Sequence, residues 1–245
     1  MTVLGVIPAR YASTRFPGKP LALIAGKPMI QHVYERVALC TGLDGVVVAT
    51  DDDRIRECVE GFDGRVAMTS PDHASGTDRL GEVAGQERHA YYVNIQGDEP
   101  LIQTAAIDKL IEETQNNVAL MSTLASRIDM ATDAAMVNDP NVVKVARAQD
   151  GYALYFSRAA IPHPRNAEHA VYYKHIGIYM YMRQTLLELC KLPPSPLEKA
   201  ESLEQLRALE HGVPILAVET EYNPVGVDVP EDIALAEKRL RELEG

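Results

Sequence analysis

Short apolar runs rich in β-branched residues alternate with stretches of helical period through the first hundred residues of the chain. The helical stretches space their apolar residues three or four positions apart, as one buried helix face requires. Strand and helix in repeated alternation predict a mostly parallel, doubly wound α/β sheet with helices on both faces. We expect strands at 3–8, 45–50, 65–70 and 91–95, and helices at 28–40, 51–60 and 77–89.

The pattern changes after about residue 118. Residues 142–158 form two strand-like runs around an Asp-Gly pair, which is a strong hairpin signal, and 172–182 is a further strand-like run. We expect a smaller antiparallel element at roughly 119–182, inserted into a single domain that spans residues 1–245. The first pattern then returns, with an acidic helix predicted at 196–210, a strand at 214–219 and a closing helix from Pro230.

Composition limits the class of protein. The chain has 245 residues, of which 46% are hydrophobic, and this is enough for a sizeable core. No apolar run approaches the roughly 18 to 20 residues of a membrane span, and no signal-peptide pattern opens the chain, so we expect a cytoplasmic protein. A formal charge of −11 makes nucleic acid an unfavourable partner. The three cysteines are far apart, so we expect reduced core residues.

The loop after the first predicted strand carries the clearest chemical signal. It reads "VIPARYASTRFPGKP" and places Arg10, Arg15 and Lys19 among small residues and prolines. The glycine pattern of dinucleotide sites and the P-loop are both missing from it. Small residues let a ligand approach backbone N–H groups, and the cations can neutralise several phosphate oxygens. The pattern favours a triphosphate-binding loop over a solvated loop with scattered cations.

This loop and a series of later motifs resemble the 3-deoxy-manno-octulosonate (Kdo) cytidylyltransferases, or CMP-Kdo synthetases. The match begins at "IPARYASTRFPGKPLALIAGKPMIQHV" and covers nearly the whole chain in order. It continues through "ATDDDRI", "MTSPDHASGTDR", "NIQGDEP", "YALYFSRAAIP", "KHIGIYMY", "SPLEKAESLEQLRALEHG" and "GVDVPED". The opening core is shared with CMP-sialic acid synthetases, so it indicates the reaction class, whereas the later motifs indicate the sugar. The resemblance implies a Rossmann-like sheet of the nucleotide-diphospho-sugar transferase type and a homodimer.

In this family the anomeric hydroxyl of Kdo attacks the α-phosphorus of CTP, which gives CMP-Kdo for lipopolysaccharide biosynthesis and pyrophosphate. Negative charge grows on the phosphoryl oxygens in the transition state, so fixed cations stabilise it. The resemblance implies catalytic roles for Arg10, Arg15, Lys19 and Asp98. The implied CTP-binding residues are Ala9, Arg10, Ser13, Lys19, Ser75, Gly76, Thr77, Gln96 and Asp98.

Two aspartates match the magnesium ligands of the family. Asp98 and Asp228 each follow a predicted strand, and Mg²⁺ binds through one or two carboxylates with phosphates and waters completing its shell. Taken alone, Asp98 is equally consistent with a turn residue, and Asp228 with a helix N-cap. Ser75 and Thr77 are likewise consistent with simple capping residues.

The sugar site implied by the resemblance consists of Arg158, His175, Tyr179 and Glu204. The spacing of His175 and Tyr179 puts both side chains on the same face if they share one strand. A structural histidine and a solvated Glu204 are the plainer alternatives.

The segment "IPHPRNAEHAVYYKH" is shorter than in typical family members, and the chain has no tryptophan. An 8-amino variant of Kdo, or another nonulosonate such as sialic acid, therefore stays open as the substrate. A non-catalytic nucleotide-binding protein on the same fold is the alternative from another class.

Overall fold

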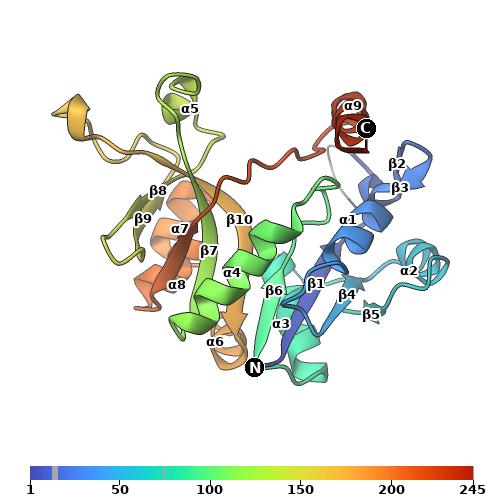
Figure 1. Cartoon of the computed structure of the whole chain (residues 1–245). Coiled ribbons are helices and arrows are strands. Elements are labelled where there is room, and N and C mark those ends of the chain that lie inside the picture. Colours follow the sequence, from blue (N-terminus) through green and yellow to red (C-terminus); the bar gives the residue numbers. More distant parts are fainter. Residues whose placement is uncertain (13–15, 74, 245) are drawn as a thin grey trace. The chain divides into compact units, whose positions relative to one another are not determined.

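The computed structural model describes residues 1–12, 16–73 and 75–244. The chain divides into two compact units. Unit 1 comprises Met1–Asp108 and Pro224–Gly245, and unit 2 comprises Lys109–Asn223. Figure 1 labels most of the helices and strands of both units.

Unit 1 contains four parallel strands, in the order β6, β1, β4 and β5. The central strand β1 (Val3–Ala9) is almost entirely buried, and Leu4 lies opposite Gly45 on one side and Tyr92 on the other. The remaining strands are β4 (Gly45–Thr50), β5 (Val66–Met68) and β6 (Tyr91–Asn94). The predicted parallel strands are confirmed.

Helices cover both faces of this sheet. The chain moves outward from β1 through α1 (Met29–Val37) and α2 (Asp53–Glu60), and it returns to β6 through α3 (Gly76–Gln86). Right-handed crossovers therefore place α3 on the opposite face from α1 and α2. The contacts agree, because a Cβ at Gly5 would lie 3.5 Å from Val37, whereas one at Gly76 would lie 3.3 Å from Pro8. The predicted doubly wound arrangement is confirmed.

Short elements and the C-terminal helix complete unit 1. They are η1 (Lys19–Leu21), β2 (Leu23–Ile24), β3 (Lys27–Pro28) and α9 (Asp232–Glu244). A hydrophobic cluster joins Ile24 and Met29 to Val227 and to Ala236 and Leu240 of α9. Figure 1 shows α9 beside β2 and β3. This packing holds the segment before α9 against the start of the chain.

Unit 2 is built on β7 (Met121–Arg127), which pairs antiparallel with β10 (Tyr173–Met182) and parallel with β11 (Ile215–Glu219). The predicted hairpin is confirmed as β8 (Lys144–Arg147) and β9 (Ala153–Ser157), and β8 also pairs with β10. Helix α4 (Thr104–Asn116) leads from unit 1 into unit 2. The other helices are α5 (Ala135–Asn138), η2 (Ala167–His169), α6 (Arg183–Leu189), α7 (Pro196–Glu201) and α8 (Gln205–Glu210).

Two of the expected helices differ from the structure. The single helix predicted at 196–210 is wrong, because Ser202 adopts a left-handed backbone with φ 54° and separates α7 from α8. This break buries Leu203. The closing helix begins at Asp232 rather than at Pro230, and the Asp232 carboxylate accepts hydrogen bonds from the N–H groups of Asp228 and Val229. Helix α4 and strand β7 were not among the predicted elements.

The prediction that the cysteines are reduced is confirmed, whereas the prediction that they lie in the core is wrong for two of the three. Cys40, Cys58 and Cys190 are free thiols, and burial raises the pKa of Cys40 to about 12. Cys40 is buried, whereas the other two are half-buried. None of the helices in the described ranges combines the length and the apolar character that a bilayer span requires.

Candidate active site

Three loops of unit 1 meet where β1 ends. A Cβ at Gly97 would lie 3.1 Å from the carbonyl oxygen of Pro8, and one at Gly76 would lie 3.3 Å from the Pro8 ring. The residues after Pro8 therefore lie beside the start of α3 and the loop that follows β6. Seven of the predicted CTP-binding residues gather here: Ala9, Arg10, Ser75, Gly76, Thr77, Gln96 and Asp98. The predicted residues Ser13 and Arg15 lie outside the described ranges.

The loop between Arg10 and Lys19 is closed at its base. The N–H of Gly18 donates to the carbonyl of Tyr11 at 2.9 Å. Gly18 has φ 72°, a left-handed conformation that favours glycine, and this turn leads directly into η1. The guanidinium of Arg54 stacks on the Tyr11 ring, 3.3 Å from its centroid. Arg10 and Lys19 thus flank a closed loop at the carboxyl edge of the sheet.

Lys19 lies between the two predicted metal ligands. Its ammonium is 2.7 Å from a carboxylate oxygen of Asp98 and 3.4 Å from one of Asp228. The two oxygens can lie no farther apart than the sum of these distances. Three segments that are far apart in the sequence therefore bring one cation and two carboxylates to one point.

A backbone hydrogen bond fixes this convergence. The N–H of Val227 donates to the carbonyl of Asp98 at 2.9 Å, and the Val227 side chain is fully buried in the cluster with Met29 and α9. The N–H groups that precede α9 are capped by Asp232, at 2.8 and 3.0 Å. The alternative role of Asp228 as a helix N-cap is therefore wrong, and its carboxylate turns to Lys19 instead.

Asp98 and Asp228 fit a divalent cation that prefers oxygen ligands. Both carboxylates already bind one positive charge, the Lys19 ammonium, and their two negative charges could likewise neutralise a divalent cation. Within the described ranges, no group of three or more His, Cys, Asp and Glu side chains could hold a metal ion. The pair therefore suits an ion that takes its remaining ligands from phosphate and water, as Mg²⁺ does.

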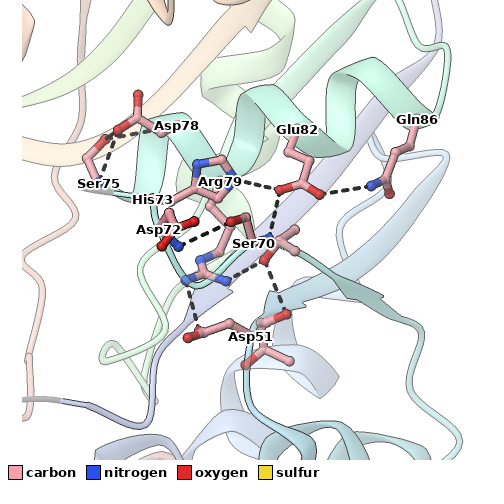
Figure 2. A network of polar contacts seen from close by, with 11 residues as sticks. Asp51, Ser70, Asp72, His73, Ser75, Asp78, Arg79, Glu82 and Gln86 are labelled. Atoms are coloured by element: carbon pink, nitrogen blue, oxygen red, sulfur yellow. Dashed lines mark hydrogen bonds and ion pairs between the residues drawn. The ribbon is translucent and has the colours of Figure 1, made fainter.

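The start of α3 is fixed by a capping box, drawn in Figure 2. The Ser75 hydroxyl accepts a hydrogen bond from the N–H of Asp78, and the Asp78 carboxylate accepts one from the N–H of Ser75. The alternative role of Ser75 as a cap is confirmed, while Thr77 is the second residue of the helix. Because its hydroxyl is bonded to Asp78, the role of Ser75 here is to fix the first turn of α3.

Arg79 is a buried residue that sequence reasoning missed. Its side chain lies 2.9 Å from the Asp51 carboxylate at the end of β4, and it donates to the Thr69 hydroxyl beyond β5. Figure 2 shows the guanidinium between α3 and Asp51. Burial and the nearby charge of Arg10 lower the pKa of Arg79, whereas Asp51 opposes this shift. The ion pair ties two strand ends to α3. Its position directly after the "SGTD" run was the one available signal.

Glu82 fastens the segment before α3 to the same helix. Its carboxylate accepts from the N–H of Ser70 at 2.9 Å, contacts His73 Nε2 at 2.5 Å and accepts from Gln86. These bonds are drawn in Figure 2. The Ser70 N–H, followed by His73, lowers the pKa of Glu82. Glu82 therefore fixes both Ser70 and His73 in the segment that precedes the predicted base-binding residues.

Unit 2 brings three of the four predicted sugar-site residues together. The rings of His175 and Tyr179 lie 5.4 Å apart, so the prediction that they share a face of the strand is confirmed. This holds although β10 changes register between Ile176 and Tyr179. Burial raises the pKa of Tyr179 well above 10, and the neighbouring charges of Tyr181 and Glu204 add to this. Glu204, at the start of α8, is exposed.

The His175 ring contacts the Thr123 hydroxyl of β7. The Thr123 hydroxyl lies 3.0 Å from the carbonyl oxygen of Ile176 and 2.8 Å from that of Ile178, both in β10, and its single O–H donates to one of them. Its lone pair, 3.1 Å from His175 Nε2, therefore accepts the Nε2–H. Burial lowers the pKa of His175 to about 3. Its Nδ1 is left as a hydrogen-bond acceptor.

The guanidinium of Arg158 is held by main-chain oxygens. Its Nε donates to the carbonyl of Glu201 at 2.8 Å, and Nη1 donates to the carbonyl of Pro140 at 3.0 Å. The fourth predicted sugar-site residue is therefore fixed by α7 and by the turn before β8.

Comparisons with known proteins find similar sequences over nearly the whole chain. Residues 4–219 match the family model described as cytidylyltransferase. The 3-deoxy-manno-octulosonate cytidylyltransferase of Geobacter sulfurreducens is 52% identical, over 98% of this chain and 100% of its own. The enzyme of that name from Solibacter usitatus is 53% identical, over 94% of this chain and 91% of its own.

The solved structures agree with these relatives. A structure of CMP:2-keto-3-deoxy-manno-octonic acid synthetase complexed with CTP superposes with a TM-score of 0.94 at 45% identity, over 99% of both chains. A putative glucose-1-phosphate thymidylyltransferase from Bacillus anthracis has a TM-score of 0.67 at 20% identity over 98% of this chain and 96% of its own, which shows a likeness of fold alone. With its length matched by the family model and by relatives above 50% identity, this chain belongs to the cytidylyltransferase family, among the 3-deoxy-manno-octulosonate cytidylyltransferases.

Proposed function

We propose that the protein couples CTP to Kdo, giving CMP-Kdo and pyrophosphate. The convergence of Lys19, Asp98 and Asp228 carries the proposal, because phosphoryl transfer requires fixed charges around the reacting phosphate. Relatives named for this activity, at about half identity, support the choice of both substrates.

In the proposed reaction the anomeric hydroxyl oxygen of Kdo forms a bond to the α-phosphorus of CTP. The bond from that phosphorus to the oxygen bridging to the β-phosphate breaks, pyrophosphate leaves with the electron pair, and the hydroxyl proton passes to solvent. Arg10 and Lys19 would neutralise the phosphate oxygens, and losing one such aimed donor costs about 2.7–4 kcal/mol of barrier. Lys19 would exchange its two carboxylates for phosphate oxygens when the nucleotide binds.

We also propose that Asp98 and Asp228 hold Mg²⁺. When bound, the ion would activate the sugar hydroxyl and neutralise the α-phosphate. The protein supplies two carboxylates at a fixed separation, and the Val227–Asp98 hydrogen bond maintains that separation.

The sugar acid would be bound by the unit 2 residues. Tyr179 keeps its proton at working pH because its pKa is raised, and neutral His175 offers an acceptor nitrogen, so both suit sugar hydroxyls. Arg158 suits the carboxylate, and Glu204 can accept from a further hydroxyl.

We further propose a homodimer formed along the outer edge of β9. Within the described ranges, β9 pairs as a strand only with β8, and Leu154 on it is 65% exposed. Strand β10 adds little apolar area to this edge, because Ile176, Ile178 and Met180 are buried. Sedimentation velocity at micromolar concentration should give a dimer that Leu154→Asp shifts to monomer. A monomeric wild type would refute the dimer.

A coupled pyrophosphate assay tests the proposed activity. CTP and Mg²⁺ would be offered with Kdo, 8-amino-Kdo and sialic acid in parallel. We expect the highest kcat/KM with Kdo. A preference for 8-amino-Kdo or sialic acid would make that sugar acid the substrate and leave the reaction class unchanged. A protein that binds CTP but releases no pyrophosphate with any of them would be a non-catalytic nucleotide-binding protein.

A further inference from the structure

Lys144 is a fully buried lysine in strand β8 of unit 2. Its ammonium donates to three main-chain carbonyl groups, those of Asp139 at 2.8 Å, Val142 at 2.5 Å and Arg158 at 2.6 Å. An ammonium has three N–H donors, so all of them are used. A buried charge is costly unless it is satisfied in this way, which makes a passive packing role a poor explanation of a lysine here.

The three carbonyl groups come from two segments. Asp139 and Val142 lie in the turn that leads into β8, and Arg158 follows the end of β9. The ammonium therefore joins the entry of the hairpin to its exit. This is the same exit at which the predicted carboxylate-binding residue Arg158 stands.

Both partners of the Arg158 side chain depend on this region. Pro140, whose carbonyl accepts from Nη1 of Arg158, lies between the two turn residues that Lys144 holds. Glu201, whose carbonyl accepts from Nε, also binds the main-chain N–H of Arg158 and the Ser157 hydroxyl through its carboxylate, at 3.0 and 2.6 Å. Lys144 and Glu201 thus fix Arg158 at its main-chain oxygen, its main-chain nitrogen and its guanidinium.

The same turn reaches the second sugar-site residue. The carbonyl of Val143, next to Lys144, accepts a hydrogen bond from the main-chain N–H of His175 at 2.9 Å. Lys144 itself lies opposite Lys174, the residue before His175, in the pairing of β8 with β10. The turn that Lys144 holds is therefore bonded to the strand that carries His175 and Tyr179.

We propose that Lys144 is a positioning residue for the sugar acid: its ammonium, together with Glu201, fixes the Arg158 guanidinium that binds the carboxylate of the substrate. The proposal rests on the proposed function, which it deepens. Lys144 does not contact the substrate itself. Its removal leaves three buried carbonyl groups without a donor, so the turn and the Arg158 backbone shift apart.

The test is a comparison of KM values in Lys144→Met, which keeps the length of the side chain and removes its charge. With Kdo varied at saturating CTP, we expect the KM for Kdo to rise about tenfold or more, which corresponds to the loss of one well-placed charged hydrogen bond. The KM for CTP should stay within about twofold, and kcat should change little because the lost binding is uniform. The matched control is Lys199→Met, the same change at an exposed lysine of α7, which should alter neither KM.

Several outcomes would overturn the proposal. A lower melting temperature with an unchanged KM for Kdo would show a purely structural lysine, and a parallel rise of both KM values would show general damage. If Lys144→Met does not fold, Glu201→Ala replaces it, with an expected rise of about fivefold in the KM for Kdo alone. An unchanged value there would equally overturn the proposal. A wild type inactive with every sugar acid would overturn the proposed function as well, whereas an active wild type with unaltered variants would overturn this proposal alone.

Discussion

Replacing Lys19 by Met should change metal binding and catalysis in opposite directions. The Lys19 ammonium contacts Asp98 at 2.7 Å and Asp228 at 3.4 Å, so it competes with any cation for the two carboxylates. The Asp98 and Asp228 side chains are 32% and 54% exposed, and solvent therefore screens these ion pairs. A competing interaction of this kind is worth about 1 kcal/mol.

The magnitudes follow from these contacts. Loss of about 1 kcal/mol of competition should tighten Mn²⁺ or Mg²⁺ binding to the free protein about fivefold. Turnover should fall by about 10² to 10³, because the same ammonium is an aimed donor to the phosphates in the proposed reaction. A general disturbance of the fold would weaken both properties together.

The assay is a titration of Mn²⁺ followed by electron paramagnetic resonance, together with pyrophosphate release at saturating substrates. Lys27→Met is the matched control, since Lys27 forms an exposed ion pair with Glu35 at 2.6 Å in the same unit. The control should leave both readouts unchanged. Unchanged or weaker Mn²⁺ binding in Lys19→Met would refute the idea that Lys19 shares its carboxylates with the metal.

Three further changes should be visible in stability. Since the pKa of His175 is lowered to about 3 from 6.5, folding excludes its proton, and the folded state loses stability as pH falls through 6.5 toward 3. His175→Gln should therefore lose less melting temperature than wild type between pH 7.5 and 5, and an equal loss would contradict the assignment. Gly97→Ala should cost about 1–2 kcal/mol in urea unfolding, because its Cβ would lie 3.1 Å from the Pro8 carbonyl oxygen, and an unchanged midpoint would argue against that close approach. Arg79→Met should cost about 3 kcal/mol by leaving Asp51 without its partner, and full stability would show that this ion pair contributes nothing net.

The periodic parts of the fold were predictable from sequence because burial alone determines them. Strand β4 occupies the predicted range 45–50, and the Asp-Gly pair marked the β8–β9 hairpin. The division of 196–210 into α7 and α8 was not predictable, since the residue at the break, Ser202, is neither a glycine nor a proline. Burial of Leu203, a tertiary effect, outweighs the local helical pattern there.

The sequence motifs select residues that the fold brings together at the end of β1, but they do not give the geometry of that region. The meeting of Asp98 and Asp228 depends on the Val227 hydrogen bond and on the packing of α9, neither of which leaves a periodic signal. Nothing in the sequence distinguishes Glu201 from the other acids of its stretch, or marks Lys144 as buried. Such residues act through main-chain carbonyl and N–H groups, whose positions only the folded chain defines.

The most direct test of the metal-centred mechanism is the rate of pyrophosphate release by Asp98→Asn with saturating CTP, Kdo and Mg²⁺. The side chain keeps its size and loses its charge, so the melting temperature should stay close to that of wild type. We expect the rate to fall by about 10² or more, as for the loss of one principal electrostatic contact to the transition state. A rate near that of wild type would contradict the role of this carboxylate and the mechanism built on it.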